Sequence, residues 1–304
     1  MDATVVEAAR GAIGRVGVVL PITFAAPPPL DLQRDSVRRL EAAGYRTAWT
    51  NEVPGKDALA QLSVLLAATG RMAFGTFIAN VWVREPETAH AAAAVLAQAY
   101  PGRFVLGLGV GYPEQAAAVG RSFGSPLTTM RDYVARMDGP QRFLAPDVRY
   151  PRLIAALGPK MLALSGEVAD GALPAMLPPE FTAAARETLG PDKLLVTGLS
   201  IIPDTDPDRA REAAREALSG YLGRPTIAAA LTRLGYPDER PGAVSDRLVE
   251  ASYGYGGPEA IAAKVREHLA AGSDHVTLLL PMGSDFARGI EQYLELAPAL
   301  TELG

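Results

Sequence analysis

The amino-acid sequence predicts an α/β protein built as a (β/α)8 TIM barrel, in which eight parallel strands are each followed by a helix. Eight short apolar runs alternate with helix-length amphipathic segments along the 304 residues. The runs lack a regular polar alternation, which is typical of strands buried on both faces of a parallel sheet. The competing fold is a doubly wound sheet, but eight strand–helix units exceed the five or six strands usual there. The length of the chain also matches that of a barrel.

The predicted strands are rich in Val, Ile, Leu and Phe. Each is short and is followed by a segment with helical periodicity. In chain order, the predicted strands are Val16–Leu20, Thr47–Thr50, Met72–Ala79, Arg103–Gly109, Arg152–Ala156, Gly171–Ala175, Leu194–Ile202 and His275–Leu280.

Proline and glycine mark the ends of the predicted helices, because proline is tolerated in the first turn and glycine often follows the last one. Pro86 opens one helix, and Gly44 and Gly70 follow two others. The predicted helices are Leu30–Ala43, Ala58–Thr69, Pro86–Tyr100, Pro113–Met137, Lys160–Ala169, Pro179–Leu189, Asp208–Leu222, Pro258–Ala271 and Phe286–Leu303.

No internal repeat or linker divides the chain, so residues 1–304 are predicted to form one domain. The segment at about residues 203–274 is longer than the other connections and is predicted to be an insertion-like helical segment. Gly254, Gly256 and Gly257 predict a flexible loop in it that could act as a lid. Its tyrosines offer rings and hydroxyls to a substrate pocket, although packing between helices explains them equally well; they are Tyr221, Tyr236, Tyr253 and Tyr255.

The composition excludes several classes of function. The chain contains no cysteine, which rules out disulfides, thiolate nucleophiles and Cys-ligated metals. A net charge of −5 without a basic cluster argues against nucleic-acid binding. No apolar run is long enough to span a membrane, and the segment Met1–Arg10 is not a cationic signal region. We therefore expect a cytoplasmic protein with no membrane partner.

The three histidines, His90, His268 and His275, have spacings that favour structural roles over a metal site or a catalytic one. No Ser–His–Asp set and no cluster of metal ligands can be argued from the sequence, so we expect no metal.

In a barrel of this kind, the chemistry lies at the C-terminal ends of the strands, on the loops that lead into the helices. The segment Gly107–Gly111 ends the fourth predicted strand with three glycines at a spacing of two. These glycines would let a ligand approach the backbone, or they would relieve crowding in the barrel interior. The segment is not a dinucleotide fingerprint, because Tyr112 stands where that motif needs its third glycine.

Two further segments are candidates for binding. Leu157-Gly158-Pro159-Lys160 begins a helix directly after the fifth strand, so free backbone N–H groups, the helix dipole and Lys160 favour an anion site there. An ordinary helix start is an equally good interpretation. Asn51-Glu52 follows the second strand, where the pair would either hydrogen-bond a ligand or anchor the loop. Acid–base chemistry at this end would use Glu52, Glu114 or a tyrosine such as Tyr112.

Several segments are similar to one known family. They are Gly14–Val18, Glu41–Trp49, Gly75–Asn80, Tyr100–Gly111, Ala155–Leu162, Gly166–Gly171 and Ala271–Val276. The most specific are Pro101-Gly102-Arg103-Phe104 with the three glycines that follow, and Gly158-Pro159-Lys160 with Ala169-Asp170-Gly171. Together, over roughly residues 14–282, the chain resembles the luciferase-like monooxygenase superfamily, in the branch that uses the deazaflavin coenzyme F-420.

The resemblance implies a (β/α)8 barrel that holds a deazaflavin ring at its mouth and a phosphate beyond it. By position, Phe77-Ile78 would form a bulge behind the ring, where the family often has a non-prolyl cis peptide. Asn80 and Asn51 would reach the polar edge of the ring. The other coenzyme-binding residues that the resemblance implies are Gly109, Val110, Gly111 and Tyr112 along the side chain, and Leu157, Gly158, Pro159 and Lys160 around its phosphate.

The resemblance implies an oxidoreductase that moves a hydride between coenzyme F-420 and an unknown small organic substrate. Sugar-phosphate dehydrogenases of the family carry an Asp-His pair where this chain has Asn51-Glu52. Asn51 and Glu52 are therefore the candidate catalytic residues, with Glu52 in the position of the missing imidazole. The alternatives are an FMN-dependent monooxygenase supplied by a partner reductase, and a non-catalytic flavin- or deazaflavin-binding protein. The family also tends towards dimers, so we expect a homodimer.

Overall fold

The computed structural model describes residues 3–23, 27–53, 55–139 and 145–303, and its strands form a closed parallel barrel. The predicted fold is confirmed. The last strand of the barrel, β10, pairs with both β1 and β8 and so closes the ring. In order around the barrel, the strands are β1 (Val16–Val19), β2 (Thr47–Thr50), β3 (Ala73–Thr76), β5 (Phe104–Gly109), β6 (Arg152–Ile154), β7 (Gly171–Ala172), β8 (Leu194–Pro203) and β10 (His275–Leu279).

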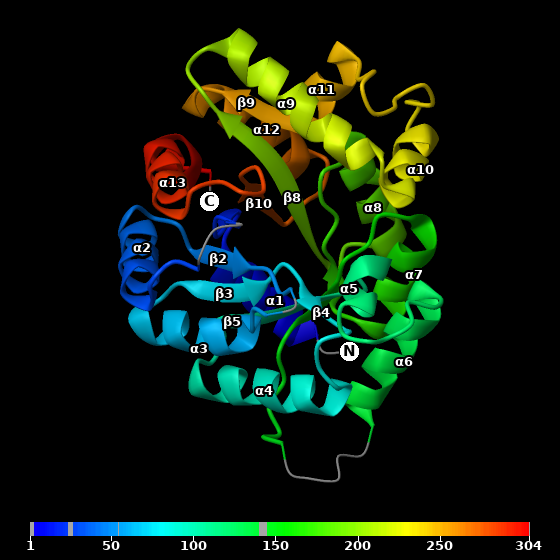
Figure 1. The fold of residues 1–304 in the computed structure, drawn as a ribbon. Helices are drawn as coiled ribbons and strands as arrows, with labels where there is room; N and C mark the ends of the chain where they lie inside the picture. Colours follow the sequence, from blue (N-terminus) through cyan, green and yellow to red (C-terminus); the bar gives the residue numbers. More distant parts are fainter. Residues whose placement is uncertain (1–2, 24–26, 54, 140–144, 304) are drawn as a thin grey trace.

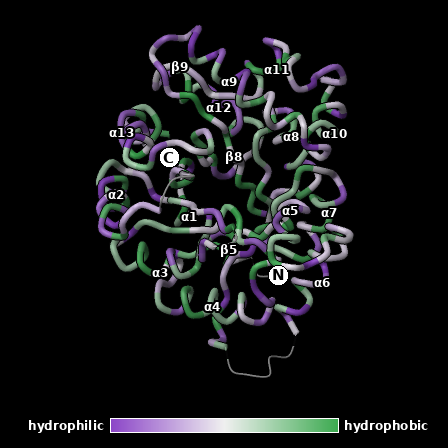
Figure 2. Tube along the Cα trace, viewed as in Figure 1, coloured by the Kyte–Doolittle hydropathy of each residue, from purple (hydrophilic) through white to green (hydrophobic). Residues whose placement is uncertain are grey.

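A ring of helices surrounds the strands (Figure 1). Most of the predicted helices are confirmed to within a residue or two at each end. In Figure 2 these helices alternate between hydrophobic and hydrophilic colouring along their length, as expected for helices with one buried face. The helices of the ring are α2 (Leu30–Ala42), α3 (Ala58–Ala68), α4 (Pro86–Ala99), α6 (Pro126–Asp138), α7 (Pro159–Val168), α8 (Pro179–Leu189), α12 (Pro258–Ala270) and α13 (Phe286–Thr301).

An additional helix, α1 (Ala3–Ile13), closes the end of the barrel at which the strands begin. Its buried residues Val6, Ala9 and Ile13 pack into the cluster that fills the barrel interior. The carbonyl of Ile13 accepts a hydrogen bond from Thr47 Oγ1 at the first residue of β2. Helix α1 thus covers the end at which the strands begin, and we call the opposite end, where the strands finish, the mouth of the barrel.

The prediction of one helix over Pro113–Met137 is wrong. The structure has two helices there, α5 (Pro113–Ala117) and α6. Gly120 and Gly124 lie between them with positive φ angles of 70° and 57°, which a helix cannot contain. Ser125 then caps α6 through the backbone N–H of Thr128.

The predicted strand Met72–Ala79 is also interrupted. The chain forms β3, passes through a cis peptide bond between Phe77 and Ile78, and resumes as β4 (Ala79–Asn80). Both pieces pair with β5, so the interruption is a bulge within one strand of the barrel. This is the position at which the resemblance implied a cis peptide.

The insertion-like segment contains α9 (Pro207–Leu222), α10 (Pro225–Arg233), α11 (Asp246–Ser252) and the strand β9 (Tyr253–Gly256). The prediction of a flexible loop at Gly254–Gly257 is wrong for most of its length. Strand β8 is ten residues long, and its outer end pairs with β9 from Ser200 to Pro203. The three helices α9, α10 and α11 gather beyond β8 and α12 (Figure 1).

The predicted substrate-facing tyrosines of this segment differ in burial. Tyr236 and Tyr253 are buried in the hydrophobic cluster of the segment, which favours packing for both. Tyr221 and Tyr255 are partly buried. Within the described residues, no helix is long and apolar enough to cross a membrane.

Candidate active site

The floor of the mouth is apolar. Trp49 on β2 is fully buried in the cluster that fills the barrel, and the partly buried Phe77, Ile78 and Leu279 pack against that cluster. The rings of Trp49 and Phe77 meet edge to face, with centroids 6.2 Å apart. A flat apolar ligand such as an aromatic ring system would therefore rest on side chains that are already packed from below.

The backbone of Phe77-Ile78 is fixed by the end of strand β2. The N–H of Phe77 donates to the carbonyl of Thr50 at 2.7 Å, and the N–H of Glu52 donates to the carbonyl of Ile78 at 3.0 Å. The two segments Asn51-Glu52 and Phe77-Ile78 are thus neighbours, as expected for consecutive strands of a barrel.

The glycines at the end of β5 serve different purposes. A Cβ atom at Gly107 would lie 2.1 Å from the carbonyl oxygen of Thr76, and one at Gly109 would lie 1.8 Å from Cδ1 of Ile78. These two positions favour the interpretation of packing in a crowded interior. Gly111 differs, because its φ of 53° lies in the left-handed region and turns the chain out of the strand.

Asn80 presents an unpaired amide beside this turn. It is 2% exposed, and its Oδ1 accepts a hydrogen bond from the N–H of Trp82 at 2.9 Å. Its Nδ2 is buried and has no hydrogen-bond partner in the described structure. A Cβ atom at Gly111 would lie 3.6 Å from this nitrogen, so the amide faces the backbone of the β5–α5 turn. A buried donor without an acceptor costs about 1–3 kcal/mol, which a ligand oxygen would recover.

Glu52 is held entirely by the protein. Its side chain is 0% exposed and forms an ion pair with Arg84. Its Oε1 accepts from the N–H of Ala58, the first residue of α3, at 3.2 Å, and its Oε2 accepts from the N–H of Asn80 at 3.0 Å. With both oxygens occupied, Glu52 ties the start of α3 to β4, which favours the loop-anchoring interpretation, and its catalytic role stays a prediction.

Lys56 also lies at the mouth, although it was not predicted from the sequence. It lies in the loop between β2 and α3, and its Nζ donates to Asn51 Oδ1 at 2.7 Å and to Thr50 Oγ1 at 2.8 Å. Burial lowers the pKa of Lys56 to about 8, and the charge of Glu52 partly opposes that shift. The only signal in the sequence was a lysine within a loop at the C-terminal end of a strand.

The predicted anion site lies on the same side of the mouth as Gly109 and Ile78. Ala155, which follows β6, lies beside Gly109, and Leu157–Lys160 continues from there into α7. No side chain caps the start of α7 at Gly158, and Lys160 is exposed. The Met161 N–H bonds to the carbonyl of Gly158 and Pro159 has no N–H, so the backbone N–H groups of Gly158 and Lys160 and the exposed Lys160 side chain are the groups of this first turn that suit an anionic ligand.

Helix α10 of the insertion brings two arginines to this region. The guanidinium of Arg224 stacks 3.7 Å from the centre of the Tyr112 ring. Arg233, at the other end of α10, places Nη2 3.5 Å from the carbonyl oxygen of Leu157. Neither arginine was predicted from the sequence, because nothing in the sequence shows that α10 lies across the β5–α5 and β6–α7 loops.

The histidines have the structural roles that the sequence predicted. His275 Nδ1 lies 2.8 Å from the carbonyl oxygen of Gly14, and its Nε2 accepts from Trp49 Nε1 at 3.2 Å. His268 is bonded to Thr182. Burial lowers the pKa of each of these two imidazoles to about 4. His90 bonds to the hydroxyl of Tyr150.

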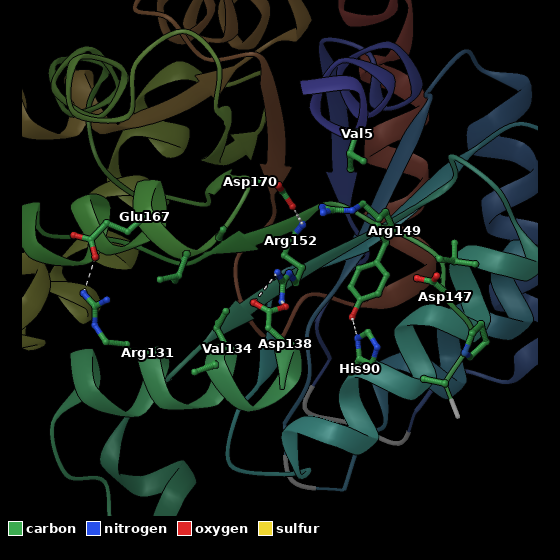
Figure 3. Close-up of a pocket in the computed structure, with 17 residues that line it drawn as sticks. Val5, His90, Arg131, Val134, Asp138, Asp147, Arg149, Arg152, Glu167 and Asp170 are labelled. Carbon is green, nitrogen blue, oxygen red and sulfur yellow. Dashed lines mark hydrogen bonds and ion pairs between the residues drawn. The ribbon is translucent and has the colours of Figure 1, made fainter. Parts of the chain in front are cut away.

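A cavity of about 790 Å³ lies at the end of the barrel where the strands begin, away from the mouth (Figure 3). Its lining includes Arg152, the first residue of β6, and Asp170, which precedes β7. Its charges are largely paired, since Arg152 bonds Asp138 and Arg131 bonds Glu167. This cavity is therefore separate from the mouth and from all the predicted site residues.

Comparison with known proteins identifies the family. The model of the family described as "Luciferase-like monooxygenase" matches residues 15–275. A 5,10-methylenetetrahydromethanopterin reductase of Methanolobus tindarius is 26% identical, over 89% of this chain and 96% of the relative. A putative coenzyme F-420-dependent oxidoreductase of Mycobacterium tuberculosis is 29% identical; that match spans 55% of this chain and 57% of the relative's length.

Among solved structures, an F-420-dependent secondary alcohol dehydrogenase in complex with an F-420–acetone adduct superposes with a TM-score of 0.72 at 18% identity. That match covers 94% of this chain and 98% of the dehydrogenase, and it shows a common fold. The closed parallel barrel, the residues around its mouth and the family match lead to one conclusion: the chain belongs to the luciferase-like monooxygenase family and is an oxidoreductase of that family.

Proposed function

We propose that this protein is a coenzyme F-420-dependent oxidoreductase that exchanges a hydride with a small organic substrate bound at the mouth of the barrel. The observation that carries the proposal is the unpaired Nδ2 of Asn80, buried beside Gly111 at the edge of the apolar floor. The polar edge of a deazaflavin carries carbonyl oxygens that this amide could bind. The likeness to F-420-dependent relatives supports the same coenzyme.

The residues present suit three parts of such a coenzyme: the ring, its polar edge and a phosphate. Phe77 and Ile78 provide an apolar surface for the ring, and Asn80 provides a donor for its polar edge. Gly158 and Lys160, together with Arg233 from the insertion, provide N–H groups and positive charge for a phosphate. When bound, the deazaflavin would supply the hydride chemistry; the protein would orient it and exclude water from the reacting carbon.

A binding titration tests the proposal. The protein is titrated with oxidised F-420 and, separately, with FMN, and both dissociation constants are measured by fluorescence. We expect micromolar binding of F-420 and binding of FMN at least tenfold weaker. Tight binding of FMN with no measurable binding of F-420 would reverse the assignment.

The FMN-dependent monooxygenase is the second candidate, and the description of the matched family favours it. It differs in its reaction, because reduced flavin reacts with oxygen whereas a reduced deazaflavin reacts poorly with it. Incubating the loaded protein with oxygen and a reductase system therefore separates the two. A protein that binds F-420 but turns over no substrate in a broad panel would instead be a carrier.

A further inference from the structure

The mouth of the barrel needs a group that can handle a proton. When a hydride moves to or from a carbon–oxygen bond, the oxygen must gain or lose a proton in the same reaction. Glu52, the predicted candidate, has both carboxylate oxygens bound by Arg84 and two backbone N–H groups. The chain has three histidines, and the contacts described above place none of them at the mouth.

Lys56 is placed where such a group is needed. Asn51 directly follows the last residue of β2, at the end of the barrel where the strands finish. Lys56 Nζ lies 2.7 Å from Asn51 Oδ1. The residue after Asn51 is in turn bonded to the carbonyl of Ile78, so Lys56, Asn51 and the Phe77-Ile78 bulge lie together.

The hydrogen bonds of Lys56 suit both protonation states. An ammonium has three N–H donors, and two of them bind Asn51 and Thr50. A neutral amine retains two N–H groups and gains a lone pair. Both bonds can therefore persist after deprotonation, and the lone pair then points in the third direction. Thr50 Oγ1 is itself fixed, because it donates to Gln61 Oε1 at 2.7 Å.

We propose that Lys56 is the residue that exchanges a proton with the oxygen of an alcohol or carbonyl substrate, which rests on the proposed F-420-dependent function. In the oxidation of an alcohol, the C–H bond breaks and its electron pair leaves with the hydrogen as a hydride to the oxidised coenzyme. The O–H bond breaks, its proton passes to neutral Lys56 Nζ, and a C=O double bond forms. The reverse reaction returns the proton from the ammonium.

The surroundings of Lys56 lower its pKa from the ordinary value of a lysine to about 8. Burial favours the neutral amine, and the pKa of Lys56 lies at about 8. Glu52 is the charged group that acts in the other direction, and Arg84 neutralises it through their ion pair. Asp57, the next residue along the chain, also pairs with Arg84. The two carboxylates and the one guanidinium leave a net negative charge, which favours the ammonium, and burial is the larger effect.

The proton equilibrium of Lys56 can be measured without any substrate. The chain has four lysines, Lys56, Lys160, Lys193 and Lys264, so a sample labelled with ¹³C at the lysine ε carbons gives few signals. The Lys56→Arg variant identifies the signal of interest by its loss. We expect that signal to titrate near pH 8; a midpoint above about pH 10, where free lysine titrates, would overturn the proposal.

Kinetics then test the proton transfer. Oxidised F-420 is mixed with the probe alcohols isopropanol and cyclohexanol, and reduction of the coenzyme is followed by absorbance. In the wild-type protein, kcat should rise with pH through a midpoint near 8, because the neutral amine is the base. Lys56→Arg keeps the charge and donors to Asn51 and Thr50 but cannot accept a proton, so kcat should fall about 100-fold.

Two controls separate proton transfer from structure. Lys264→Arg, a change on α12 away from the predicted site residues that retains a cation for the ion pair with Glu267, should leave kcat and the pH profile unchanged. In Lys56→Ala, added ethylamine should restore part of kcat in proportion to the free amine. Rescue would not follow from a merely structural defect.

The outcomes distinguish the two proposals. Failure of the wild-type protein to bind F-420 would remove the proposed function itself. Binding of F-420 without oxidation of either alcohol would overturn the assignment of Lys56 and its substrate class while leaving the coenzyme in place. Turnover by Lys56→Arg with an unchanged pH profile would do the same.

Discussion

Single side chains at the mouth divide into those that hold the protein together and those left free for a ligand. Glu52 has its two carboxylate oxygens occupied and its side chain fully buried, whereas Asn80 keeps one amide nitrogen without a partner. Lys56 has features of both groups, because its two hydrogen bonds persist in either protonation state and the third position on Nζ has no assigned partner among the described residues. The difference lies in the remaining hydrogen-bonding capacity of each group, which burial alone would not reveal.

Replacing Glu52 by Gln should destabilise the protein. The change leaves the largely buried Arg84 with the half-exposed Asp57 as its remaining carboxylate partner and places an NH2 donor against a backbone N–H, so the free energy of unfolding should fall by about 3 kcal/mol. Urea denaturation measures the effect. The matched control is Asp57→Asn, which removes the half-exposed partner of the same arginine, retains a capping side chain for α3, and should cost less than about 1 kcal/mol. A Glu52→Gln protein with wild-type stability but no activity would restore the catalytic role predicted from the sequence.

Replacing Asn80 by Asp should weaken binding of F-420 about tenfold. The aspartate keeps an acceptor for the N–H of Trp82 but loses the donor that we assign to the ring of the coenzyme. A loss of about 1.4 kcal/mol corresponds to that factor. The dissociation constant is measured by fluorescence, and circular dichroism checks the fold. An unchanged dissociation constant would place the ring away from Asn80.

At the scale of elements, the sequence predicts the barrel strands well because they are buried on both faces and therefore form clear apolar runs. It fails where the structure depends on partners remote in the chain. Strand β9 contains two glycines that suggested a loop, yet the long outer end of β8 provides a pairing edge for it. Helix α1 was not predicted at all, although Val6, Ala9 and Ile13 have helical spacing.

The same reason explains what the sequence shows of the candidate site. The motifs at Gly107–Gly111 and Gly158–Lys160 are local, and the structure brings both to the C-terminal ends of neighbouring strands. Arg224 and Arg233 come from an insertion whose position the sequence does not encode locally. The lowered pKa of Lys56 arises from burial by neighbouring elements, so no sequence motif predicts it.

The two glycines inside β5 should tolerate alanine to different degrees. At Gly107 the added Cβ meets the backbone carbonyl of Thr76, which cannot move without disturbing β3. At Gly109 it meets Cδ1 of Ile78, the flexible end of a side chain. Gly107→Ala should therefore lower the free energy of unfolding by about 3 kcal/mol and Gly109→Ala by about 1 kcal/mol. Urea denaturation of both variants checks the order; equal losses would show that the interior adjusts as a whole.

At the scale of the whole molecule, the barrel is plugged at one end by α1 and presents its candidate site at the other. The insertion extends the wall on the side of the predicted phosphate, through α10. The buried histidines belong to the scaffold and not to the mouth, so they affect the stability of the fold as the pH changes.

Stability should fall as the pH is lowered from about 6.5 towards about 4. His268 and His275 have a pKa of about 4 in the folded protein and 6.5 as the reference value, so the unfolded chain binds more protons between these limits. Each histidine should then cost about 1.4 kcal/mol of unfolding free energy per pH unit. Urea denaturation at pH 7, 6 and 5 gives the slope. A free energy of unfolding that stays constant over this range would contradict the neutral, buried state of both imidazoles.

We propose that one deazaflavin lies across the mouth, from the Phe77-Ile78 bulge to the start of α7. A crystal structure of the protein with bound oxidised F-420 tests it most directly. We predict that the ring rests on Phe77 and Ile78 with a carbonyl oxygen within hydrogen-bonding distance of Asn80 Nδ2, and that the phosphate lies between Gly158–Lys160 and Arg233. A coenzyme bound elsewhere, or a ring whose polar edge faces away from Asn80, would contradict the account.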